Sequence, residues 1–177
     1  FIFMAPEDKA MAMLERYNAK YILVFITLGI GQSSEGGSYV VRSVGYGDEG
    51  KWVWMARISG QARDRFIKEG LLDENSAWTD EATFINKTSG EWYDTGKNTT
   101  IYKLMSWAKQ RWADVSGAQS RITADEAGVQ PTYFKEAYFA GENLNAIDAS
   151  AKYGGLIPII ALYEIDWQKY YNATSQP

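Results

Sequence analysis

The two longest apolar stretches of the chain are short and rich in residues that favour β-strands. They run over residues 21–30 and 156–162. A membrane-spanning helix needs about 20 consecutive apolar residues, so neither stretch is long enough to cross a bilayer. Runs of this length and composition are typical of buried strands. We therefore expect a central strand over 21–27, buried on both faces, and a second strand over 156–166.

Further elements follow from turn residues and helical periodicity. Strand-like sequence recurs over 133–140 and in a short piece at 39–41, whereas the Gly/Ser-rich residues 29–38 favour a loop. Helices are expected over 7–17, 48–69 and 101–115. Asn18 ends the first, Gly70 the second, and Thr99 or Thr100 caps the third. Residues 73–100 are expected to form loops with at most short elements. The sequence thus predicts one soluble α/β or α+β domain over 1–177, with a small sheet and several helices.

The amino-acid composition excludes several kinds of catalytic and metal-binding chemistry. The 177 residues include no cysteine and no histidine, and the formal net charge is −4. Disulfides, thiolate catalysis, zinc fingers and histidine-based acid–base chemistry are therefore excluded for these residues. The acidic balance argues against nucleic acid as a partner, because such a surface needs a basic footprint. A metal site would have to be built from carboxylates and carbonyls.

One helix face combines groups able to hold a small ligand. At about 100° per residue, Asp48, Lys51, Met55 and Ile58 fall within an arc of roughly 80°. The four side chains supply a carboxylate, an ammonium, a thioether and a branched aliphatic group. Together they could bind a small ligand that carries one hydroxyl and one methyl. The alternative is structural: an Asp48 N-cap, an i,i+3 partner at Lys51, and core packing beyond. Trp52 and Trp54 point elsewhere, which favours packing over a sugar platform.

Three Asn-x-Thr sequons occur in polar, turn-like sequence. They begin at Asn86, Asn98 and Asn172, which are the candidate glycosylation sites. They fit a secreted or cell-surface chain, but loops are in any case rich in Asn and Thr. Both interpretations stay open on the sequence.

The spacing Asp48-x-x-Lys51-x-x-x-Met55-x-x-Ile58 resembles the DK-type signature of the catalytic subunit of oligosaccharyltransferases, the Stt3/AglB family. Residues 47–58 look particularly archaeal. Residues 6–24 resemble the family's helix-then-strand segment, 98–105 a later core helix, and 134–138 with 160–165 its closing strands. These similarities cover nearly the whole chain in the same order.

The resemblance implies a glycosyltransferase of protein N-glycosylation, which moves an oligosaccharide from a lipid-linked donor to Asn in Asn-x-Ser/Thr. In such an enzyme a multi-pass membrane domain supplies the donor site and the acids that bind Mg²⁺ or Mn²⁺. The soluble C-terminal domain lies on the extracytoplasmic face and recognises the acceptor protein or peptide. Lys51 and Met55 match residues implicated in the pocket for the sequon Ser/Thr. Ile58 shares their face, and Asp48 would orient Lys51 or the acceptor.

The sequence departs from the family pattern in one respect. It has no WWDYG motif, and the nearest string, 91–96, follows the DK helix instead of preceding it. We therefore carry no role over to Trp92 or Asp94. The chain is expected to be an inactive fragment, without catalytic, cofactor or metal residues, whose parent has the membrane domain and WWDYG upstream. A carbohydrate-binding or adhesive extracellular module without catalytic activity is the alternative, suggested by the aromatic content of 15%.

Overall fold

A computed structural model shows the fold over most of the chain. The residues that it describes are 2–32, 39–43, 47–48, 50–51, 54–55, 67–68, 74–75, 84, 86, 88–89, 91–116, 119–120, 130–140, 148, 151–152 and 154–175.

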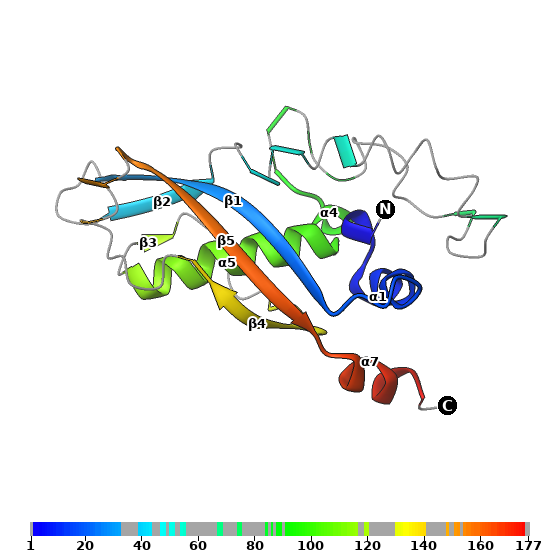
Figure 1. The fold of residues 1–177 in the computed structure, drawn as a ribbon. Coiled ribbons are helices and arrows are strands. Elements are labelled where there is room, and N and C mark those ends of the chain that lie inside the picture. The colour runs from blue at the N-terminus through cyan, green and yellow to red at the C-terminus, as the bar shows by residue number, and fades with distance from the viewer. Residues whose placement is uncertain are drawn as a thin grey trace.

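The centre of the described structure is a five-stranded sheet in the order β3-β2-β1-β5-β4 (Figure 1). Pairing is antiparallel from β2 through β1 and β5 to β4, and β3 adds in parallel to β2. The strands are β1 (Tyr21–Gln32), β2 (Tyr39–Ser43), β3 (Gln119–Ser120), β4 (Phe134–Phe139) and β5 (Leu156–Ile165).

One long helix lies against a single face of this sheet. α5 packs on β1, β2 and β3, while the shorter helices α1 and α7 lie toward one end of the sheet (Figure 1). The helical elements include the 3₁₀ turn η1 (Ile2–Met4) and the α-helices α1 (Glu7–Glu15), α4 (Asp94–Lys97), α5 (Thr100–Ser116) and α7 (Trp167–Thr174). Residues 48, 50, 51, 54 and 55 are also helical.

The core fills the space between α5 and the sheet. Alternate residues of β1 and β5 point into it, and they meet the apolar stripe of α5, which includes the fully buried Trp112. The Tyr163 hydroxyl donates to the Leu104 carbonyl across this layer at 3.0 Å. Burial raises the pKa of Tyr163 well above its usual value, so the hydroxyl stays protonated and remains a donor.

The predicted mixed architecture is confirmed, including a helix that starts near Asp48. Asn18 ends α1 with a positive φ of 50°, as a left-handed C-terminal residue does. Two expectations were wrong. β1 continues to Gln32, so 29–32 belong to a strand and not to the predicted loop. β1 is the middle strand, but its first half is covered on one face only: Tyr21 and Leu23 are about half exposed.

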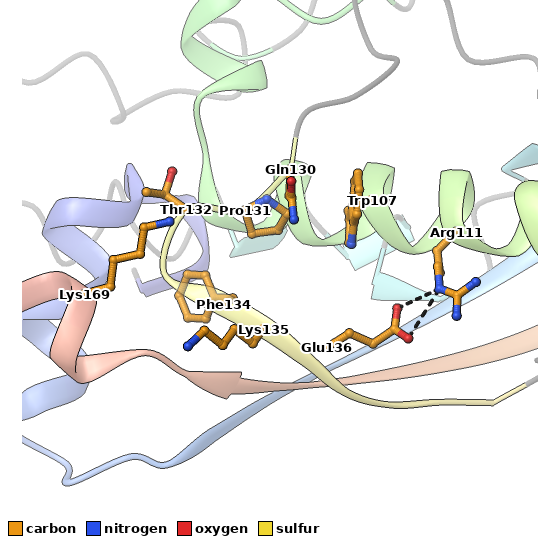
Figure 2. A pocket seen from close by; sticks show the side chains of 9 residues that line it. All are labelled: Trp107, Arg111, Gln130, Pro131, Thr132, Phe134, Lys135, Glu136 and Lys169. Atoms are coloured by element: carbon orange, nitrogen blue, oxygen red, sulfur yellow. Dashed lines mark hydrogen bonds and ion pairs between the residues drawn. The ribbon is translucent and has the colours of Figure 1, made fainter.

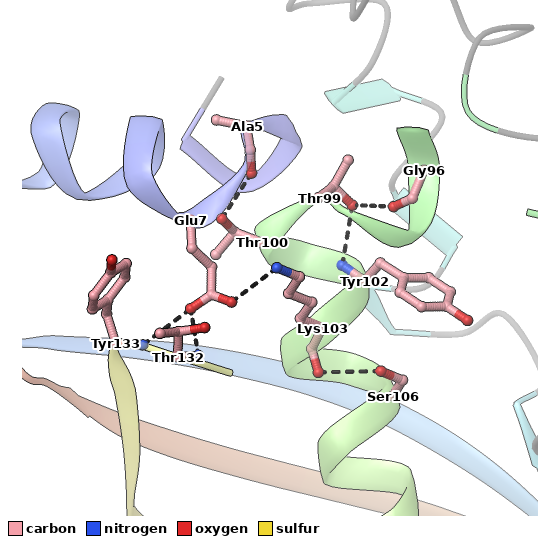
Figure 3. A network of polar contacts seen from close by, with 10 residues as sticks. All are labelled: Ala5, Glu7, Gly96, Thr99, Thr100, Tyr102, Lys103, Ser106, Thr132 and Tyr133. Carbon is pink, nitrogen blue, oxygen red and sulfur yellow. Dashed lines mark hydrogen bonds and ion pairs between the residues drawn. The ribbon is translucent and has the colours of Figure 1, made fainter. Parts of the chain in front are cut away.

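Glu7 joins three separate parts of the chain (Figure 3). Its carboxylate is buried, and Oε2 accepts hydrogen bonds from the amides of Thr132 and Tyr133 at 2.6 and 3.0 Å. Oε1 lies 3.1 Å from Nζ of Lys103 on α5, an ion pair without hydrogen-bond alignment. The start of α1 therefore fixes both α5 and the segment that leads into β4.

Asp166 starts α7, a helix that the sequence pattern did not predict. Its Oδ1 accepts from the Lys169 amide at 3.1 Å, and its Oδ2 lies 2.7 Å from Nζ of Lys135 on β4. The hydrogen bond from Lys135, followed by that from the Lys169 amide, lowers the pKa of Asp166. A lowered pKa in the folded state stabilises the fold above the unfolded-state pKa of about 3.9, and this contribution disappears as pH falls.

Asp166→Ala is therefore expected to lower the free energy of unfolding by about 1 kcal/mol at neutral pH, because it removes the cap. The difference from the unmodified chain should shrink below about pH 4. Urea unfolding on both sides of that pH measures it. Asp166→Asn keeps a cap acceptor and should lose less. An equal loss for Asp166→Ala at both pH values would contradict this role.

Candidate functional site

The Asp48 carboxylate is held at the edge of β1. β2 ends at Ser43, opposite Leu28, and so does not reach the earlier residues of β1 on that edge. There the Phe25 amide donates to Asp48 Oδ2 at 2.7 Å. The Asp48 side chain is only 18% exposed. The structural alternative made Asp48 an N-cap of its own helix; among the described residues its carboxylate instead accepts from the sheet and fixes the helix start to β1.

Lys51 lies one turn further along and points its charge toward water. Its Nζ is 3.5 Å from Asp48 Oδ1, and its side chain is 63% exposed. An ion pair this open contributes little stability, typically below about 1 kcal/mol. The pair therefore leaves an ammonium and a carboxylate oxygen beside each other at the surface, able to donate to and accept from one ligand hydroxyl.

Met55 brings an apolar group to the same helix. It is partly buried and packs against the main core, so part of its side chain serves packing. Asp48, Lys51 and Met55 are thus all helical, and the i,i+3 contact of the first two and the core packing of Met55 are also what the structural alternative predicted. Ile58, the fourth residue predicted for this face, lies outside the described residues, as do Trp52 and most of the helix expected to run to Glu69.

Trp54 corrects one expectation. We expected it to pack, but its side chain is 62% exposed. It occupies a helical position between Lys51 and Met55. Periodicity alone could not place it, because what covers a helix depends on distant segments of the chain.

The string at 91–96 has a structural role. Trp92 is half-buried, and its ring lies 5.0 Å from that of Tyr102 on α5. Gly96 is packed so tightly that an added Cβ would lie 2.6 Å from Trp92 Cε3 and closer still to the Phe84 carbonyl oxygen. The Tyr93 amide bonds to that same carbonyl. Residues 92, 93 and 96 thus take part in packing within the fold.

The three sequons differ in setting, contrary to the expectation that all lie in turns. Asn86 is in a turn, where its Oδ1 accepts from the amides of Thr88 and Ser89. Thr100 of the second sequon is fully buried at the start of α5 and donates to the Ala5 carbonyl. The third sequon, at Asn172, lies within α7. Of the three sequons, the one at Asn86 is therefore the one whose Thr is both exposed and outside a helix.

A hollow that the sequence patterns did not predict lies between α5, β4 and α7 (Figure 2). Its volume is about 560 Å³, and Trp107, Arg111, Phe134, Lys135 and Lys169 are among its lining residues. Arg111 contacts Glu136 at 3.2 Å, and Lys135 is paired with Asp166. Two of the cations that line the hollow, Arg111 and Lys135, therefore already have acidic partners.

Neither a metal site nor a membrane span is found in the part of the chain that the structure describes. No three carboxylates there are grouped closely enough to hold an ion. No helix among the described residues combines the length and the apolar content needed to cross a bilayer.

Comparison of the chain with models of known families, with curated proteins and with solved structures gives no match. The resemblance to oligosaccharyltransferases therefore rests on the sequence motifs described above, and membership of that family stays a prediction.

Proposed function

We propose that this chain is the acceptor-recognition part of an oligosaccharyltransferase that modifies Asn in Asn-x-Ser/Thr. The observation that supports the proposal most is the Asp48–Lys51 pair. It holds an exposed ammonium 3.5 Å from a carboxylate that is fixed to the sheet, with Met55 on the same helix. A sequon Thr offers a hydroxyl and a methyl, and this arrangement provides a partner for each.

Selectivity follows from unpaired polar groups. Lys51 would donate to the oxygen of the Ser/Thr hydroxyl, and Asp48 would keep the ammonium in place and accept the hydroxyl hydrogen. An acceptor residue without a hydroxyl would leave these polar groups without a partner. Sites that hydrogen-bond a substrate hydroxyl reject analogues that lack it strongly for this reason. Met55 would contact the Thr methyl. Binding at this residue positions the Asn two residues earlier for transfer.

The chemistry itself would lie outside this chain. The resemblance assigns the lipid-linked donor, the Mg²⁺ or Mn²⁺ ion and the Asn amide to a membrane domain on the extracytoplasmic side. The proposal therefore requires that the complete gene encode such a domain and a WWDYG motif upstream. This chain alone is expected to be inactive and to bind sequon peptides weakly.

Lys51→Ala in the full-length enzyme is expected to lower kcat/KM for Asn-x-Thr and Asn-x-Ser peptides by roughly 10- to 100-fold, with lipid-donor binding retained. Met55→Ala should affect Thr peptides more than Ser peptides, because a methyl contact is lost. Lys68→Ala removes an exposed helical lysine elsewhere and is the matched control. Acceptor kinetics with Thr, Ser and Ala peptides measure these effects; unchanged kinetics for Lys51→Ala would refute the pocket.

Exposed Trp54 favours a second candidate, a carbohydrate-binding module. An exposed indole beside Lys51 could stack on a sugar ring. Glycan binding by this chain that is lost on Trp54→Ala, together with a gene that encodes no membrane domain, would support that function over the transferase.

A further inference from the structure

The sheet face opposite α5 carries an unusually apolar surface. Residues paired across neighbouring antiparallel strands point to the same face. On this face Leu23 pairs with Leu162, Phe25 with Ile160, and Gly29 with Leu156, while Tyr138 of β4 lies beside Leu162. Five of its side chains are substantially exposed: Tyr21 54%, Leu23 49%, Tyr138 59%, Leu156 46% and Ile160 38%.

Charged residues occupy positions toward both ends of this face: Arg42 of β2 is paired with Gly29 near one end, and Glu164 and Lys135 mark the other. Glu164 and Lys135 lie opposite each other there, and Lys135 is also paired with Asp166. The solvated face of an antiparallel sheet normally carries polar side chains along its whole length. The central part of the face opposite α5 carries Leu, Ile, Phe, Tyr and Pro instead. An apolar partner could therefore cover this part without burying an unpaired charge.

The area fits a second copy of the chain. A fully buried aromatic side chain removes roughly 150–250 Å² from water, so half-exposed side chains leave about 100 Å² each. The five exposed residues, with smaller parts of Phe25, Pro158 and Leu162, thus offer roughly 600 Å². That is at the upper limit of the largest apolar patch on a typical monomer. It reaches the lower end of stable interfaces, which bury about 600–1,000 Å² per partner.

We propose that the chain forms a twofold dimer through this open sheet face. In a twofold dimer the same patch meets itself, so the apolar central part of the face is self-complementary. Two such sheets can pack face to face about 10 Å apart with their side chains interleaved. Glu164 and Lys135 then lie at the rim. The proposal does not depend on the acceptor-binding function, although Phe25 contributes to both regions.

Analytical ultracentrifugation of the chain over a wide concentration range tests the dimer. We expect reversible association with a dissociation constant in the micromolar range, given the modest area. Leu23→Lys combined with Ile160→Lys should weaken association at least about 100-fold, since the charges would be buried without partners. Tyr93→Lys, an exposed aromatic outside the face, is the matched control and should leave the dimer intact. Circular dichroism confirms that each variant is folded.

A second measurement needs no charged substitution. Because the chain has no cysteine, Ile160→Cys places one thiol on the open face, and Tyr93→Cys places one elsewhere. A bismaleimide should cross-link the first variant into dimers and leave the second monomeric. A chain that stays monomeric at every concentration would overturn the proposal. So would a dimer that persists in the folded Lys variant, because another surface would then form the interface.

Discussion

Glu7→Ala is expected to lower the free energy of unfolding by about 3–5 kcal/mol. The substitution leaves the Lys103 ammonium, 18% exposed, without its partner and also removes the acceptor of two amides. Breaking a buried pair by deleting one member has this cost because the other charge stays desolvated. Urea unfolding at neutral pH, followed by circular dichroism, measures the effect.

Two variants separate the network from simpler effects. Asp8→Ala removes an exposed acid from the same first turn of α1, and should cost only the dipole interaction, about 0.3–1 kcal/mol. Glu7→Gln keeps an oxygen for the amides of Thr132 and Tyr133 but loses the charge opposite Lys103, so its cost should be intermediate. If Glu7→Ala were no more destabilising than Asp8→Ala, the buried network would not be holding these segments together.

The strands and helices that the sequence predicted are those with a strong local signal. The apolar run at 21–27 and the helical stripe from Ile101 to Trp112 both appear where periodicity placed them. α7 was missed although its cap is local: Asp166 accepts from the Lys169 amide three residues on, which is an N-cap signal the sequence offers. Its ion pair with Lys135, 31 residues earlier on β4, leaves no such pattern.

Burial was harder to predict than secondary structure. The run Tyr21–Thr27 is as apolar as a strand covered on both sides, yet Tyr21 and Leu23 face an uncovered surface. Composition gives the apolar content of a strand but not what packs on each face. The same limit explains why Trp54 was expected to pack.

The candidate site was half predictable. Helical spacing correctly placed Lys51 one turn from Asp48. The anchoring of Asp48 to the Phe25 amide was not foreseeable, because it depends on where β2 stops pairing with β1. The anchor means that the carboxylate beside Lys51 is held by the sheet as well as by its own helix.

Trp112→Ala is expected to lower the free energy of unfolding by about 3–5 kcal/mol, the usual cost of removing a large aromatic from a core. Trp112 is fully buried on α5 between the helix and the sheet. Trp107→Ala on the same helix is the matched control; Trp107 is only partly buried and should cost clearly less. Urea unfolding of the three proteins compares them directly.

Trp112→Phe separates the volume of the side chain from its polar group. The indole N–H of Trp112 is buried without a hydrogen-bond acceptor, and such a group costs about 1–3 kcal/mol. Phenylalanine keeps most of the apolar volume and removes this donor, so the loss from the smaller ring is partly offset. We expect Trp112→Phe to cost less than about 2 kcal/mol. If it destabilised the fold as much as Trp112→Ala, packing around the indole would outweigh the unpaired N–H, and the offset inferred from burial would be wrong.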